Sequence, residues 1–367
     1  MFFDWLTVEQ DFGFQLPFLA DVAYQRIFVD TGEGSQLNQA PYVHKGSFCD
    51  TLIIKIRGSL LRISGNPSRW NRLDNLFGLP SVDACMSVYN GVCRQLGLPE
   101  FTRGTFLKPS QIGNTFISDG AVIKELHITE NISVGAGNVD AYLSGLSTQR
   151  YRNSVPRLHT DGKTVDWLSV RGNANLIYPS VYDKAYEMWL HQLPKLKNTF
   201  SNDSPEVEYL NRLIDYCNSV GIVRFEQKLK SRYLQKNNLC YWGMSDFSKL
   251  NTLHSEFLHL DRKLQVTAMD FETISELLLS AGVVDTTRAA NTTAMYALQW
   301  MHGQSFNLSR RSIQTHRARL RKVGIDIAQP CNISRFSPVF VTAAREVTPA
   351  AVSVPSWYQM PRYLAAV

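Results

Sequence analysis

A carboxylate and an imidazole lie two residues apart in the run VIKELHIT, where Glu125 and His127 flank Leu126. The alternation predicts a β-strand, on which residues two apart share a face, so these two side chains would lie side by side. Such a pair could bind Mg²⁺ or Mn²⁺, and the imidazole favours Mn²⁺. The same pair could also be an ordinary polar contact on the surface of a strand.

A second carboxylate, Glu226, lies in the run VGIVRFEQKLKSRYL over residues 220–234. Apolar and charged residues alternate there, which predicts a strand with Glu226 among Arg224, Lys228 and Lys230 on one face. An edge or cleft strand that holds one carboxylate among several cations suits metal-assisted chemistry on a phosphodiester. A charged face that is simply exposed to water is the alternative interpretation.

Tyrosines are concentrated in residues 178–189, which read YPSVYDKAYEMW. The Pro-Ser dipeptide suits the start of a helix, on which Tyr182 and Tyr186 would share a face at positions i and i+4. A phenol, with a pKa of about 10, attacks a phosphate poorly unless a nearby cation such as Lys184, or a bound metal, stabilises the charge. Rings that only pack against a sheet are the alternative.

A basic segment without acidic residues extends over residues 301–323. Ser309 as N-cap and Gly324 as C-cap predict a helix there, and residues 292–302 predict a helix before it, so the pair has a helix–turn–helix outline. Because no acid compensates the cations, contact with phosphates is favoured over a solvent-exposed basic face. The cations are Arg310, Arg311, Arg317, Arg319, Arg321 and Lys322.

The elements that must position these residues are strands interleaved with helices, which predict an α+β fold with a central antiparallel sheet flanked by helices. We expect this domain at residues 1–240, a smaller, mostly α-helical domain at 241–345, and a flexible, proline-containing tail at 346–367. The predicted strands are residues 4–12, 51–64 with a bend at Gly58, 113–129, 164–170, 174–178 and 220–234. The predicted helices are residues 81–96 with Ser81 and Gly97 as caps, 138–148, 181–193, 207–218, 257–280, 292–302 and 309–323.

The composition narrows the class of protein. The 367 residues carry a net charge of +6, which suits a polyanionic partner. No apolar run reaches the ~18 residues of a membrane span, and the N-terminus lacks the basic segment of a signal peptide. The six cysteines form no CxxC pair and predict buried thiols in a reducing cytoplasm. Because the sequence has no GxxxxGK[ST] loop, a nucleotide-hydrolysing helicase is disfavoured.

Four runs of this sequence resemble the gene II replication initiators of filamentous phages. The clearest, GIVRFEQKLKSRYL at residues 221–234, is similar to the family's LVRFE–basic–RYL segment. ISGNPSRWNRLDNLFG at 63–78 and VYDKAYEM at 181–188 are similar to the family's NxFG and tyrosine–x–lysine segments. LRKVGIDI at 320–327 is similar to its end-of-helix pattern, so the resemblance extends over most of the chain.

The resemblance implies a rolling-circle nickase, an endonuclease related to the histidine–hydrophobic–histidine enzymes. In that chemistry a tyrosine attacks one DNA phosphodiester, keeps the 5′ phosphate, and leaves a 3′ hydroxyl that primes synthesis before the displaced circle is rejoined. By position, the nucleophile would be Tyr182 with Lys184 as its electrostatic partner, followed as candidates by Tyr186 and Tyr178. The chain reads Glu-Leu-His where the family often reads Arg–hydrophobic–Asp, which leaves the ligand set open.

The proposed chemistry also calls for a divalent metal, Mg²⁺ or Mn²⁺, for which the candidate ligands are Glu125, His127 and Glu226. Phage origin DNA, a host helicase and a host polymerase would be the partners, in the cytoplasm of the host bacterium and without a membrane. The candidates for binding DNA are Arg224, Lys228, Lys230, Arg232, Arg310, Arg311, Arg317 and Arg321. A non-catalytic helix–turn–helix regulator is the alternative function, and a tyrosine recombinase is disfavoured because its Arg–His–Arg set is not recognisable. The oligomeric state stays open.

Overall fold

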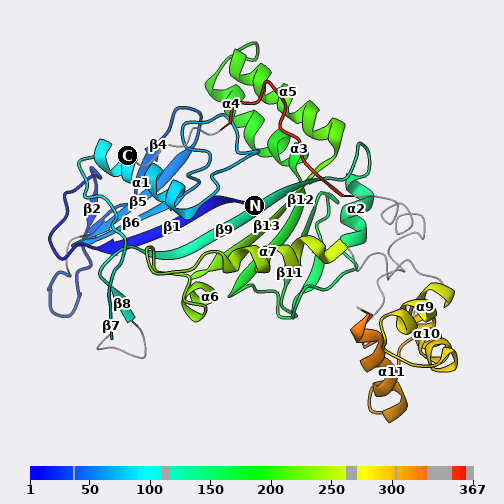
Figure 1. The fold of residues 1–367 in the computed structure, drawn as a ribbon. Coiled ribbons are helices and arrows are strands. Elements are labelled where there is room, and N and C mark those ends of the chain that lie inside the picture. The colour runs from blue at the N-terminus through cyan, green and yellow to red at the C-terminus, as the bar shows by residue number, and fades with distance from the viewer. Residues whose placement is uncertain are drawn as a thin grey trace.

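A computed structural model of the chain describes residues 1–35, 38–109, 116–261, 271–301, 304–323, 325–328 and 349–360. One large sheet forms the centre of the molecule, and helices lie on both of its faces (Figure 1). The C-terminal helices form a separate hydrophobic core. The predicted α+β fold, with a central antiparallel sheet, flanking helices and a helical C-terminal region, is thereby confirmed.

The large sheet places strand β9 (Val122–Ser133) at its centre, with antiparallel neighbours on both sides. β13 (Ile222–Lys230) pairs with one edge of β9, and β1 (Phe2–Asp11) pairs with the other. Segments that are far apart in the sequence therefore meet at the middle of the sheet. Beyond β13 lie, in order, β12 (Ile177–Asp183), β11 (Thr164–Leu168) and β10 (Val155–Leu158); beyond β1 lie β6 (Leu60–Gly65), β5 (Thr51–Arg57) and β4 (Tyr42–Lys45).

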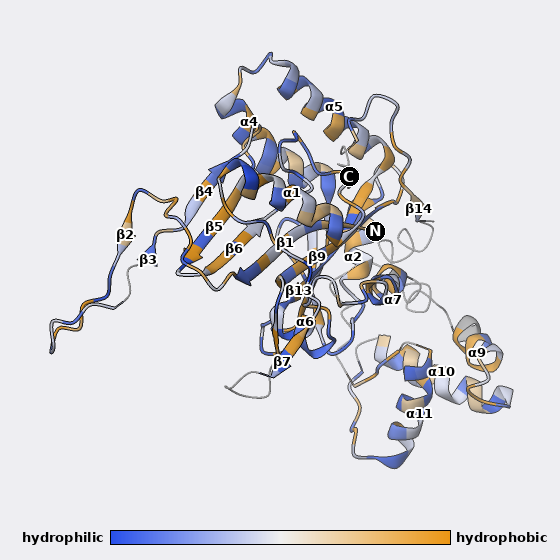
Figure 2. Ribbon diagram, turned by 60° about the vertical axis from the view of Figure 1, so that its left-hand side comes forward, coloured by the Kyte–Doolittle hydropathy of each residue, from blue (hydrophilic) through white to orange (hydrophobic). Residues whose placement is uncertain are grey.

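The first part of the chain forms the strands that its sequence predicts. β5 and β6 are joined at a tight turn where Gly58 has a φ of +60°, a left-handed conformation that favours glycine. Two short antiparallel pairs lie outside the large sheet, and one of them forms an arm that projects from it (Figure 2). The projecting pair is β2 (Ala23–Tyr24) with β3 (Asn38–Gln39), and the other is β7 (Leu107–Pro109) with β8 (Phe116–Ser118).

One face of the large sheet is apolar and packs against helices. α1 begins where the sequence predicts, because the Ser81 hydroxyl accepts a hydrogen bond from a first-turn amide at 3.1 Å. Its apolar side packs with Leu6 of β1 and Leu126 of β9, and Phe257 packs on Phe225 of β13 with ring centroids 5.2 Å apart. The helices on this face are α1 (Val82–Gln95), α2 (Val139–Leu146), α6 (Ser231–Lys236) and α7 (Lys249–Leu258).

The opposite face, called the polar face below, carries charged and aromatic side chains of β9, β12 and β13. Four helical segments pack over one end of it around Met188, Leu213 and Ile222. The last of them ends at Gly221, where φ is +63° and an added Cβ would lie 2.0 Å from the carbonyl oxygen of Gly135, so only glycine fits. The segments are α3 (Lys184–Glu187), the π-helix η1 (Met188–Gln192), α4 (Leu193–Thr199) and α5 (Pro205–Val220).

The helix predicted at residues 181–193 begins later than expected, which changes the setting of Tyr182. β12 continues to its end in register with β13, so Tyr182 lies on a strand. The Asp183 carboxylate then accepts a hydrogen bond from the Tyr186 amide at 3.1 Å and caps α3. The prediction that Tyr182 and Tyr186 share a helix face is therefore wrong. Pro194, just beyond the predicted helix, lies in the first turn of α4.

Three C-terminal helices, α9 (Phe271–Ser280), α10 (Thr287–Met301) and α11 (Arg311–Lys322), pack on one another around their own core. The helix predicted at 257–280 is divided, since α7 ends at Leu258, a 3-10 turn follows, and α9 begins at Phe271. The N-cap of α11 is Arg310 and not Ser309, because the Ser309 hydroxyl donates to the Asn307 side chain at 2.6 Å. The expected C-cap, Gly324, lies outside the described residues.

The tail predicted to be flexible at 346–367 is instead bound to the sheet domain where the structure describes it. β14 (Ala350–Ala351) pairs with the end of β9. Tyr358 is buried, and its hydroxyl donates to the Asp74 carboxylate at 2.7 Å while it accepts from the Phe77 amide at 3.0 Å. The prolines suggested a flexible tail, but the buried side chain of Tyr358 holds this segment against the sheet domain. The limits proposed for the three domains remain predictions.

Two predictions from composition can be compared with the described residues. Cys49, Cys85, Cys93, Cys217 and Cys240 are free thiols, and all but Cys49 are buried. The prediction of buried thiols is thus confirmed at four of these positions and is wrong for the partly exposed Cys49, while Cys331 lies outside the described part of the chain. Within the described ranges, no helix is both long enough and apolar enough to cross a membrane.

Candidate active site

Cross-strand register brings the predicted site residues together on the polar face. His127 on β9 lies opposite Lys228 on β13, which lies opposite Tyr178 on β12. In the next row Glu226 has Thr129 and Ser180 as its partners, and in the third row Arg224 has Asn131 and Tyr182. Strand pairing alone therefore explains why segments a hundred residues apart form one polar cluster.

Glu125, His127 and Glu226 form a hydrogen-bonded triad at the centre of this face. The Nδ1 atom of His127 lies 2.8 Å from Oε1 of Glu226, and its Nε2 atom lies 2.9 Å from Oε1 of Glu125. The ring of Trp5, from β1, is stacked near the imidazole with centroids 5.8 Å apart. The prediction that Glu125 and His127 lie side by side is confirmed, and Glu226 joins them from the adjacent strand.

The protonation of the triad follows from its contacts. Burial opposes the charged form of His127, but hydrogen bonds to the two carboxylates raise its pKa above the ordinary value. Burial likewise opposes ionisation of Glu226, yet the hydrogen bond and charge of His127 lower the pKa of this carboxyl. Because both carboxylates accept, the imidazole donates from both nitrogens, which is its protonated form. Lys230 pairs with Glu125, and the Lys228 amine lies 3.7 Å from Glu226.

The donor set of the triad suits a hard divalent cation, since two carboxylates and an imidazole are ligands that Mn²⁺ accepts. Beside it, the Thr129 hydroxyl is buried without a hydrogen-bond partner in the described chain. As they stand, both ring nitrogens of His127 are bonded to carboxylates. Among the described residues, no three His, Cys, Asp or Glu side chains are placed to hold a metal ion. A cation would have to replace one of the hydrogen bonds of His127.

Tyr182 is a candidate nucleophile with an unbonded hydroxyl. It makes no hydrogen bond to the described part of the chain, and it lies on the polar face beside Arg224, diagonal to Glu226. Burial raises the pKa of this phenol well above 10, and the negative charge of Glu226 raises it further while Arg224 lowers it. The phenol is therefore neutral, and a cation at Glu226 would remove one of the effects that hold its proton in place.

The two other tyrosines lie in different settings. The Tyr178 hydroxyl donates to Asp166 at 2.8 Å, and burial together with this bond raises its pKa to about 12. Its ring lies below the Lys228 amine, which is 5.4 Å from the ring centroid. Tyr186 stands at the start of α3, where its ring contacts Trp189 at 5.7 Å between centroids. Within the described chain the hydroxyls of Tyr182 and Tyr186 both lack a hydrogen bond, and Tyr182 is distinguished by its place on the polar face beside Arg224.

Asp166 anchors a polar cluster that was not predicted from the sequence. Its carboxylate is fully buried and accepts two hydrogen bonds from Arg157, at 3.1 and 2.6 Å, besides the one from Tyr178. His159 lies 3.0 Å from the same carboxylate. The available signal was an acid inside the apolar alternation of TVDWL on β11, since a buried carboxylate needs partners.

Arg224 was expected to contact DNA, and the structure contradicts this. Its side chain is fully buried, with the guanidinium donating to Asn131 Oδ1 at 2.8 Å and to the carbonyl oxygens of Asn75 and Leu76 at 2.7 and 2.9 Å. The Asp4 carboxylate lies 3.5 Å away. β13 lies between β12 and β9 and is not an edge strand, so Arg224 serves the fold.

Lys184 is also committed within the protein. Its amine is buried and donates to Asn75 Oδ1 at 3.0 Å and to Glu187 at 2.5 Å. Burial and the nearby charge of Arg224 lower the pKa of this amine. The predicted pairing of Lys184 with Tyr182 is not among the contacts of the described chain, and Arg224 is the cation beside this tyrosine.

The remaining candidates for binding DNA differ in their exposure and in whether an acid pairs with them. Lys228 and Lys230 are partly exposed next to the triad, and Arg232 is exposed on α6. On α11, Arg317 donates to Asp326 at 2.7 and 3.0 Å. Part of the positive charge of residues 301–323 is therefore balanced by an acid that lies just after this segment. The α11 candidates that stay exposed are Arg310, Arg311 and Arg321.

Comparison with known proteins decides the family. Two family models match, one for the N-terminal part of the phage replication-associated protein of gene II, at residues 3–256, and one for its C-terminal part, at residues 278–364. The chain belongs to this gene II replication-associated protein family. The replication-associated protein of Escherichia phage If1 is 62% identical over 315 residues, which are 85% of this chain and 98% of that protein. No solved structure matches the chain.

Membership in this family confirms the resemblance to the filamentous phage gene II proteins and assigns the chain to phage DNA replication. The N-terminal match covers nearly all of the large sheet, with β14 outside it, and includes the triad and the three tyrosines. The C-terminal match begins within α9 and includes α10 and α11.

Arg224→Met should lower the free energy of unfolding by about 3–5 kcal/mol, because it leaves Asp4 and the acceptors of the guanidinium buried without a donor. Urea denaturation followed by tryptophan fluorescence measures the loss. The matched control is Arg62→Met on β6, where the side chain is 43% exposed and its guanidinium lies 4.0 Å from Glu9, so that less than about 1 kcal/mol should be lost. Equally small losses in both variants would contradict the role of Arg224.

Proposed function

We propose that this protein initiates rolling-circle replication of phage DNA by nicking the origin through a phosphotyrosine intermediate, and later rejoins the displaced circle. The observation that carries the proposal is the position of Tyr182. Its unbonded hydroxyl lies on the polar face beside Arg224 and diagonal to Glu226. A nucleophile without a competing internal partner, next to a cluster of carboxylates and cations, suits transfer of a phosphodiester.

The nicking step is a substitution at phosphorus. The Tyr182 oxygen attacks the scissile phosphate, the new bond joins it to the 5′ phosphate, and the bond to the 3′ oxygen breaks. The phenol loses its proton in this step and the departing 3′ oxygen gains one, so that a 3′ hydroxyl is released. Because the phosphotyrosine retains the energy of a phosphodiester, attack by a later 3′ hydroxyl can rejoin the strand and release the tyrosine.

Glu125, His127 and Glu226 would hold a divalent cation, Mg²⁺ or Mn²⁺, which supplies positive charge to the scissile phosphate when it is bound. The two carboxylates would bind the cation, and His127 would have to give up one of its hydrogen bonds to serve as a ligand. Neutralising Glu226 also weakens the field that raises the pKa of Tyr182. In this proposal Lys184 acts indirectly, since it holds Asn75, whose amide donates to Asp4 at 2.7 Å beside Arg224.

DNA would enter over the polar face along Lys228, Lys230 and the exposed Arg232. The exposed arginines of α11 would bind phosphates of the same origin in addition. Host helicase and polymerase would then act at the released 3′ hydroxyl in the bacterial cytoplasm. A non-catalytic helix–turn–helix regulator would use α11 alone and would make no covalent bond to DNA, which the next experiment distinguishes.

Tyr182→Phe should lower nicking of supercoiled origin DNA by roughly 10³-fold or more, because it removes the attacking oxygen and leaves the ring in place. Tyr178→Phe and Tyr186→Phe are matched controls and should keep most of the activity. Conversion of supercoiled to open circular DNA on agarose gels, in the presence of Mn²⁺, measures each rate. Undiminished nicking by Tyr182→Phe would exclude this nucleophile, and no nicking by the wild type would favour the regulator.

Glu226→Gln should weaken Mn²⁺ binding at least about tenfold and abolish nicking, since the amide replaces a charged ligand. Electron paramagnetic resonance of free Mn²⁺ measures binding without reference to activity. Glu130→Gln is the control, because Glu130 lies on the same strand β9 but pairs with the N-terminal amine at 3.0 Å. DNA binding should stay within about twofold in both variants. Wild-type Mn²⁺ affinity in Glu226→Gln would remove Glu226 from the ligand set.

A further inference from the structure

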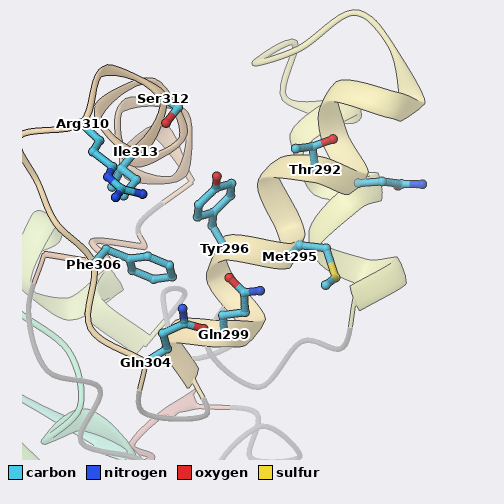
Figure 3. A pocket seen from close by; sticks show the side chains of 10 residues that line it. Thr292, Met295, Tyr296, Gln299, Gln304, Phe306, Arg310, Ser312 and Ile313 are labelled. Carbon is cyan, nitrogen blue, oxygen red and sulfur yellow. The ribbon is translucent and has the colours of Figure 1, made fainter.

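We propose that the pocket between α10 and α11 binds one unstacked base of single-stranded DNA. The pocket has a volume of about 550 Å³, within the ~300–1,000 Å³ of typical small-molecule sites. Side chains from both helices and from the segment that joins them converge on it (Figure 3). The proposal rests on DNA as the partner of the protein, but it is independent of the nicking chemistry on the sheet.

Three side-chain amides supply the polar groups of the pocket. Asn291 and Gln299 come from α10, and Gln304 follows the helix, with its backbone amide bonded to the Gln299 carbonyl at 2.9 Å. None of the three side chains has a hydrogen bond within the described chain. Each amide offers a donor and an acceptor side by side, which is the pattern that the edges of bases require.

Two aromatic rings supply the apolar surface. Tyr296 and Phe306 both line the pocket with centroids 5.5 Å apart (Figure 3). Tyr296 is held from behind by His316, which stacks on it at 4.4 Å and is bonded to Thr293 at 3.0 Å. A rigid aromatic platform beside free amides is the arrangement that proteins use to stack an unpaired base and read its edge.

The positive charge of the residues around the pocket favours a polyanion as its ligand. No aspartate or glutamate occurs between Asp285 and Asp326, whereas seven lysines and arginines do. Arg310 lines the pocket, and it caps α11 without a side-chain hydrogen bond to the first turn (Figure 3). The backbone amides of that turn and the Arg310 guanidinium can therefore hold the phosphate of the nucleotide whose base fills the pocket.

The shape of the site favours single strands over duplex. A base within a duplex has both faces stacked and its pairing edge occupied, so it cannot enter a concave pocket between two helices. A strand displaced during replication presents its bases unpaired, so that single bases can leave the stack. The pocket would thus hold the separated strand while the exposed arginines of α11 contact its phosphates.

The test combines a protein variant with removal of the bases. Gln299→Ala/Gln304→Ala deletes two pocket amides, and Arg321→Gln deletes an exposed cation of α11 that does not line the pocket. All measurements use the full chain carrying Tyr182→Phe without added metal, so that cleavage plays no part. Fluorescence anisotropy gives the affinity for a 12-nucleotide single strand of mixed sequence and for an abasic strand of the same length.

The double variant should lose roughly tenfold in affinity for the base-containing strand and nothing for the abasic strand, since each base contact contributes about 1–3 kcal/mol. Arg321→Gln should lose affinity equally for both strands, as a phosphate contact does. No loss in the double variant, or an equal loss for both strands, would overturn the pocket while leaving DNA as the partner. Failure of the parent protein to bind either strand would overturn the pocket and the proposed DNA partner together.

Discussion

The buried guanidinium of Arg224 is the interaction on which the polar face depends. It joins β13 to Asn131 of β9, to the carbonyl oxygens of Asn75 and Leu76, and to Asp4 of β1. A charge taken out of water is tolerated only when its donors find acceptors, so this contact fixes the relative positions of three strands. The triad and Tyr182 lie close to Arg224 in the strand register, so the contacts of Arg224 also fix their positions.

The sheet separates packing from chemistry. Its apolar face buries the side chains that α1, α2 and α7 need for their cores, while the polar face keeps carboxylates, an imidazole and phenols close to one another. Helices α3 to α5 close one end of the polar face. The C-terminal helices likewise pack through a core of their own, and in our proposal their pocket and basic surface are available to bind DNA.

Local periodicity predicted the strands of the triad, because a period of two specifies which side chains share a face. Glu125, His127 and Glu226 were found in this way. The same reasoning failed at Tyr182. Its spacing from Tyr186 suggested a helix, but Tyr182 pairs with β13 as part of a strand, and the helix begins only after the Asp183 cap. Burial of Arg224 and of Asp166, and the anchoring of the tail by Tyr358, depend on neighbours distant in sequence and leave little local signal.

The identity of the residue that remains bound to DNA tests the central claim most directly. Wild-type protein would be incubated with Mn²⁺ and a single-stranded origin oligonucleotide, denatured, digested with protease and nuclease, and analysed by mass spectrometry. We expect a 5′-phosphorylated nucleotide on the peptide that contains Tyr182, joined through the phenol oxygen. The same adduct on Tyr178 or Tyr186, or efficient nicking without any adduct, would contradict this account.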